Sequence, residues 1–293
     1  MTEKIEAIRK LSWRRDDFER RLGFNGGRYT KVGALCSGLI ALIFTVAYYV
    51  TLIFIPESAF TRMFTDRGWT PYAVVFLGFW TFFILFIKTR KIKLQRRPLE
   101  LPILPVDPDF TLTVDTVDEV ADTISKHAES PKDFIVYRRV VQTLSNLRNF
   151  GQISDADSLF RTQAEQDENA SQTSYALVNG FLWAIPILGF IGTVIGLSQA
   201  IGSFTGVLTA TSDISTLTPA LKDVTAGLST AFETTLVALA VALALQLFAT
   251  FVHKSEEELL DACSEYCTVN VVTKLRVRER PNIEFESESK EDD

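Results

Sequence analysis

The sequence is poor in the residues that build disulfide frameworks and metal sites. Its 293 residues include 3 Cys, an odd and sparse number that argues against a disulfide scaffold. It also has 2 His, His127 and His253, which argues against a histidine-rich metal centre. We therefore expect neither a structural metal nor a cofactor.

Two further absences narrow the function. The sequence shows no pairing of a nucleophile with histidine and no glycine-rich phosphate loop, so nothing in it supports an enzyme. The formal net charge is −6, which argues against a nucleic-acid partner. Apolar side chains, in contrast, are abundant. Hydrophobic residues make up 47% and charged residues 23%, a mixture typical of long apolar runs beside charged segments.

Four long runs almost free of charge define the class of protein. Between Lys31 and Glu57 lie 25 uncharged residues, and between Arg67 and Lys88 lie 20. Two longer runs follow in the second half, and the last contains a single charge, Glu233. About 20 apolar residues in a helix cross the hydrocarbon core of a bilayer. The sequence therefore predicts four transmembrane helices, at residues 32–56, 72–87, 176–201 and 225–252.

The distribution of Lys and Arg predicts the orientation in the bilayer. The segment 1–31 carries nine of them and the ten residues 88–97 carry six. The two connecting loops, 57–71 and 202–224, carry three between them. Because basic residues concentrate on the cytoplasmic side, we expect both termini and the middle segment in the cytoplasm and only short loops outside.

The remaining segments predict an all-α membrane protein. The middle segment, 88–175, opens with a proline-rich linker and continues as helices, the last running unbroken into the third membrane helix. The fourth membrane helix is expected to continue as a cytoplasmic helix over 253–281. The final residues, 282–293, form an acidic tail expected to be disordered. The third and fourth helices are thus predicted to extend into the cytoplasm.

Small residues recur at helical spacing in the third and fourth runs. Gly192 and Gly196 form a G-x-x-x-G pair, and Gly189 forms a second small pair with Thr193. In the fourth run, small residues form one narrow face: Gly227, Ala231, Thr235, Ala238, Ala242 and Ala249. Small residues let helix backbones approach closely in lipid. The pattern indicates either packing alone or helices that line a pore.

Two threonines and one glutamate are the polar candidates inside these runs. Counted from the outer ends of their helices, Thr193 and Thr235 lie at similar depth, ~12–15 Å from the outer end. Glu233 is the only carboxylate within the four spans. It could take part in ion transfer, reach water at the outer interface, or contact a neighbouring subunit. Residues two apart differ by about 200° around a helix, so Glu233 and Thr235 cannot share a face.

Two sequence segments carry a family resemblance. The segment 185–196 (IPILGFIGTVIG) resembles the P-L-L-G-L-L-G-T-V-x-G signature of the MotA/TolQ/ExbB proton-channel family. The segment 227–235 (GLSTAFETT) resembles that family's G-I-x-x-A-L-x-T-T. The order of the elements also matches, and the resemblance covers about 171–266. The sequence departs from the family at Ala238, where the family has Gly, and at 240–243, which lack its proline.

The resemblance implies a multi-pass protein of the bacterial inner membrane that forms a homo-oligomer, a pentamer around a single-span partner of the ExbD/TolR/MotB kind. It implies that the chain conducts ions, H⁺ or Na⁺, and uses the ion-motive force to drive that partner. On this reading Thr193, Thr235, Glu233 and Thr234 belong to the ion pathway, and the small residues to helix packing or the pore. The alternative is a structural scaffold of the same fold that conducts nothing.

Overall fold

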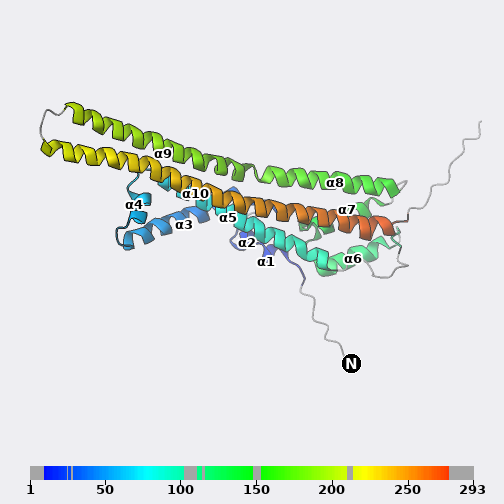
Figure 1. Ribbon diagram of the computed structural model, residues 1–293. Helices are drawn as coiled ribbons and strands as arrows, with labels where there is room; N and C mark the ends of the chain where they lie inside the picture. The colour runs from blue at the N-terminus through cyan, green and yellow to red at the C-terminus, as the bar shows by residue number, and fades with distance from the viewer. Residues whose placement is uncertain are drawn as a thin grey trace, which may run out of the picture. The chain divides into compact units, whose positions relative to one another are not determined.

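The computed structural model describes residues 10–24, 26–27, 29–101, 111–113, 116–147, 153–209 and 214–276. All regular secondary structure in these ranges is helical, with two isolated backbone bridges, Leu11 to Ala128 and Leu112 to Leu275 (Figure 1). The expected all-α fold is therefore confirmed for this part of the chain. The expected acidic tail, 282–293, and part of the second loop, 210–213, lie outside the described residues.

Four helical stretches are long and apolar enough to cross a membrane, as the uncharged runs predicted. They are α3 (Ala34–Phe54), α5 (Thr70–Arg96), α9 (Ala176–Thr209) with α8 (Ile153–Ser174) directly before it, and α10 (Ile214–Tyr266). A turn at Tyr175 separates α8 from α9, so the two are nearly continuous. The helix α10 runs for 53 residues and contains Pro219 near its start.

The chain divides into two compact units. The larger unit comprises residues 14–95 and 168–259, and contains α2 (Phe18–Arg21), α3, α4 (Ala59–Thr65), α5, α9 and most of α10. The smaller unit comprises residues 1–13, 96–167 and 260–293. Its longer described helices are α6 (Val117–His127), α7 (Ile135–Ser145) and most of α8. Its short helices are η1 (Arg97–Glu100), η2 (Pro131–Asp133), η4 (Cys267–Val271) and η5 (Val272–Lys274). The short helix α1 (Trp13–Asp16) lies at the boundary between the two units in the sequence.

Aromatic and small side chains hold α3 against α5 in the larger unit. Tyr49 stacks on Tyr72 with ring centroids 4.3 Å apart. The indole of Trp80 donates to Ser37 Oγ at 3.2 Å. Trp80 also lies against Gly38, where an added Cβ would meet the ring at 3.0 Å. The ring needs that glycine, because a larger residue would push it away from α3.

In the smaller unit, a buried arginine joins three helices. Arg139 on α7 is 1% exposed and donates through Nε to Asp167 Oδ2 at 2.9 Å and through Nη1 to Ser264 Oγ at 3.0 Å. Arg138 donates to the other oxygen of Asp167 at 2.5 Å. Because buried charges are stable only when paired and hydrogen bonded, this set fixes α7 against α8 and the end of α10.

Candidate functional site

The small residues that the sequence singled out make a close contact between α9 and α10. A Cβ added to Gly196 would lie 2.6 Å from Ala231 N and from Gly227 O, and one added to Gly227 would lie 2.7 Å from Ala200 N. A Cβ added to Gly189 would lie 2.5 Å from Ala238 Cβ. Figure 1 shows the two helices side by side over this stretch. The glycines therefore let the two backbones approach more closely than any other residue would permit.

The hydroxyls of Thr234 and Thr235 lie at the same contact. Thr235 Oγ1 donates to Gly189 O of α9 at 3.2 Å, and it lies at the same distance from Ala231 O of its own helix. Thr234 is 3% exposed, and a Cβ on Gly192 would lie 2.7 Å from its Cβ. The structure thus places both threonines of α10 against the glycines of α9.

Thr193 lies elsewhere. It is half-buried, and its Oγ1 donates to Phe190 O of its own helix at 2.6 Å. The residue opposite Thr235 is Gly189, four positions before Thr193, so the two threonines lie about 6 Å apart along the helix axis, roughly one turn. The structure therefore does not join Thr193 and Thr235 by a hydrogen bond within one chain.

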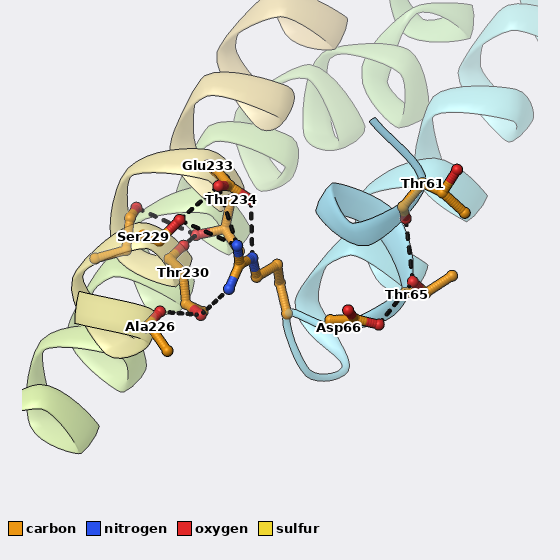
Figure 2. Close-up of polar contacts among 10 residues, drawn as sticks. Thr61, Thr65, Asp66, Ala226, Ser229, Thr230, Glu233 and Thr234 are labelled. Atoms are coloured by element: carbon orange, nitrogen blue, oxygen red, sulfur yellow. Dashed lines mark hydrogen bonds and ion pairs between the residues drawn. The ribbon is translucent and has the colours of Figure 1, made fainter. Parts of the chain in front are cut away.

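Glu233 is paired with Arg67, which lies in the loop before α5 (Figure 2). Arg67 Nε donates to Glu233 Oε2 at 2.8 Å and Nη2 to Oε1 at 3.0 Å, a two-point ion pair. Ser229 Oγ donates to Oε1 at 2.5 Å, and Arg67 also donates to Ser229 and Thr230. The side chains of Arg67 and Glu233 are 16% and 27% exposed. The glutamate thus ties α10 to the loop between α3 and α5.

Local structure explains how Arg67 reaches α10. Ser58 caps α4 by accepting from Thr61 N at 3.2 Å, which fixes the start of this short helix. Gly68 follows Arg67 with φ of +78°, a left-handed conformation that glycine adopts without strain. The chain therefore turns directly after Arg67 and enters α5 at Thr70.

Sequence reasoning missed three members of this site. Arg67 was used only for its charge in setting orientation, because nothing local indicates which distant carboxylate it meets. Thr230 and Thr70 were not singled out. Thr70 is 2% exposed, its hydroxyl has no hydrogen-bond partner among the described residues, and it lies 3.1 Å from the position of a Cβ on Gly192. A polar residue two positions before the predicted span 72–87 was the available signal.

Two cavities lie beside α10 and share Gln246. One, of about 440 Å³, is apolar and is formed by Leu182, Trp183, Pro186, Ile187, Phe190 and Gln246. The other, of about 610 Å³, is more polar and is lined by Gln172, Tyr175, Asn179, Gln246, Ala249, Thr250, His253, Lys254 and Glu257. Among the described residues, no group of three or more His, Cys, Asp or Glu is arranged to hold a metal ion.

Comparison with known proteins bears on the same helices. No curated protein and no solved structure gave a significant match to the chain. The model of the MotA/TolQ/ExbB proton channel family matches residues 127–265, a range that includes both threonines of α10, the α9 glycines and Glu233. The resemblance read from the two motifs is thereby confirmed: residues 127–265, slightly less than half of a chain with four candidate membrane-spanning helices, match the MotA/TolQ/ExbB proton channel family.

Proposed function

We propose that this chain is the ion-conducting subunit, for protons, of an inner-membrane complex that uses the ion-motive force to drive a single-span partner protein. The observation that carries the proposal is the row of hydroxyls on the small-residue face of α10. Thr234 and Thr235 lie there against Gly192 and Gly189 of α9, within the segment that matches the family model. Hydroxyl groups in an otherwise apolar wall can pass a proton or orient water beside a carboxylate of the partner.

The exposed faces of α9 and α10 support an oligomer. Large apolar side chains on both helices point away from the rest of the chain, including Trp183, Phe190, Val194, Leu197, Phe232, Leu236, Leu243 and Phe251. Lipid or another subunit must cover such faces. We propose a pentamer in which neighbouring α9 and α10 helices surround the partner, with Thr193 of one subunit close to the pore. Both termini and the long ends of α8 and α10 lie in the cytoplasm.

In this proposal Glu233 does not transfer ions, although ion transfer was one of the alternatives that the sequence left open. Its carboxylate is occupied by Arg67 and Ser229, at the end of α10 proposed to face outward. We assign it to holding the α4–α5 loop on α10, which favours the outer-interface alternative.

The proposal is tested by purifying the complex from native membranes, identifying the copurifying protein, and measuring proton uptake into vesicles that contain the complex. We expect a single-span partner and uptake that depends on it. Thr235→Val keeps the side-chain shape and removes the hydroxyl, so uptake should fall at least 10-fold (about 1.4 kcal/mol) while the oligomer persists. Thr250→Val is the matched control, because Thr250 is exposed on α10 and bonds only Gln246 O of its own helix. A parent complex without uptake would support the non-conducting scaffold instead.

A further inference from the structure

A buried cluster of charges lies at the end of α5 opposite to Thr70. Lys88 and Lys91, three residues apart on one face of α5, are each 1% exposed. They meet three carboxylates from two other parts of the larger unit: Asp17 and Glu19 of the segment before α3, and Glu256 of α10. These carboxylates are at most 1% exposed. The cluster therefore holds three acidic groups against two ammonium groups away from water.

The Lys91 ammonium lies in a cage of oxygen atoms made by the segment before α3. It forms a short ion pair with Glu19 Oε2 and donates to Lys31 O at 2.8 Å and to Gly27 O at 3.5 Å. An ammonium has three protons to donate, and these three acceptors use all of them. Asp17 Oδ2 lies further away, at 3.8 Å.

Glu19 and Glu256 each have a partner at both oxygens, although Glu256 Oε2 has an ion pair and no hydrogen bond of good geometry. Glu19 Oε1 accepts from Gly33 N at 2.7 Å in addition to its pair with Lys91. Glu256 Oε2 lies 3.0 Å from Lys88 Nζ, and Oε1 accepts a short hydrogen bond from Thr30. Lys88 also donates to Ser174 Oγ at 2.6 Å. Each of these two carboxylates thus has one ammonium and one neutral donor.

Asp17 is the carboxylate left over. Neither of its oxygens accepts a hydrogen bond from any residue that the structure describes, although the side chain is 1% exposed. The chain closes tightly over it, since a Cβ on Gly26 would lie 2.9 Å from Asp17 Oδ2 and 3.0 Å from Glu19 Oε2. An ionised carboxylate in such a place has lost its water, and the distant Lys91 ammonium and the backbone N–H of Glu19 replace it only in part, which disfavours the charged form.

We propose that this cluster binds one proton at neutral pH, on Asp17, and is a proton-binding site outside the four uncharged runs of the sequence. The bound proton balances the charges: two ammonium groups, two carboxylates and one carboxylic acid. The site joins the segment before α3 to α5 and α10, so docking of that segment is coupled to uptake of the proton. The proposal concerns equilibrium binding and holds whether or not the spans conduct ions.

The groups that face Asp17 from each neighbouring element act in both directions, and their net effect raises its pKa. Burial is the largest influence and raises the pKa of Asp17 above its usual range; the charge of Glu19 raises it further. Lys91 on α5, the backbone N–H of Glu19 and Arg20 on α2 act in the opposite direction. Lys88 and Glu256 complete the cluster and are paired with each other, and the thiol of Cys36 on α3 is also near Asp17.

Infrared spectroscopy of the purified full-length protein, in a detergent without ester groups, tests the site directly. A protonated carboxyl has a C=O band that ionised carboxylates lack and that shifts in D₂O. We expect this band at pH 7 in the parent and in Asp16→Asn, whose side chain is one-quarter exposed. It should disappear in Asp17→Asn, the neutral isostere of the protonated acid, which should also fold normally.

Two results would overturn the proposal. A parent spectrum with no D₂O-sensitive band at pH 7, or a band that persists unchanged in Asp17→Asn, would show that Asp17 is ionised. Failure of Asp17→Asn to fold while Asp16→Asn folds would do the same, because it would show that the native cluster requires the negative charge.

Discussion

Gly196 and Gly227 lie against each other's backbone: a Cβ on Gly196 would be 2.6 Å from Gly227 O, and a Cβ on Gly227 would be 2.8 Å from Gly196 O. The relationship is reciprocal, so neither glycine can grow without moving both helices. It fixes the distance between α9 and α10, and with it the position of Thr234 and Thr235.

We predict that Gly196→Ala or Gly227→Ala lowers the free energy of unfolding by about 1–3 kcal/mol, because the added methyl overlaps backbone atoms that cannot relax locally. Gly180→Ala is the control, because Gly180 lies on α9 with Gly196 and nothing lies within 4 Å of its added Cβ. Thermal unfolding in detergent measures both. Equal midpoints for Gly196→Ala and Gly180→Ala would contradict the close approach.

Arg67→Gln is predicted to destabilise the protein by about 1–3 kcal/mol, because it removes a two-point ion pair and leaves the half-buried Glu233 without its cation. Adding Glu233→Gln to Arg67→Gln should recover part of that loss, with a coupling of at least about 0.5 kcal/mol. Arg62→Gln, an exposed change on the neighbouring helix α4, serves as the control. Strictly additive effects of the two substitutions would show that the pair contributes nothing.

Lys88→Met should be more damaging, by about 3–5 kcal/mol, because it leaves Glu256 buried without an ammonium partner. The double variant Lys88→Met with Glu256→Gln should recover much of the stability, since no buried charge remains. Lys93→Met, on the exposed face of α5, should be close to neutral. The measurement is chemical or thermal unfolding of the four proteins under one detergent condition, and a double variant as unstable as Lys88→Met alone would refute it.

The raised pKa of Asp17 predicts a pH dependence of stability. Below the pKa of the unfolded chain, about 3.9, Asp17 is protonated in both states and contributes no pH dependence. Between that value and the folded pKa, the folded protein binds more protons than the unfolded chain, so stability falls as pH rises. Above the pKa of Asp17 in the folded protein, the stability that its protonation contributes is fully lost. Thermal-unfolding midpoints measured across this pH window should therefore fall less steeply with pH in Asp17→Asn than in the parent. Identical slopes of midpoint against pH would contradict the raised pKa.

Helical periodicity predicted the spans and the α9–α10 contact because both depend on local sequence. The length of a run of uncharged residues determines whether its helix can cross a bilayer. Small residues spaced three to four positions apart lie on one face of a helix, whatever the rest of the chain does. Ala231 and Ala238 therefore lie where the pattern puts them, against glycines of the neighbouring helix.

The ion pairs could not be predicted in this way. Glu233 and Arg67 are 166 positions apart, and their pairing depends on how a short loop turns at Gly68. Lys88 and Lys91 were counted only as positive charges flanking a span, although each is buried beside a carboxylate. Hydropathy and charge counting treat a basic residue as solvated, and only tertiary structure shows that it is not.

The buried charge cluster also imposes an order on biosynthesis. Lys91 meets Glu19, only 72 positions earlier, so this half of the cluster is available once α5 has emerged. Thr30 must wait for Glu256, 226 positions later, which at ~5–20 residues per second means ~11–45 s of translation. During that interval Lys88 and Thr30 lack their Glu256 partner. A product truncated before Glu256 would never complete the cluster.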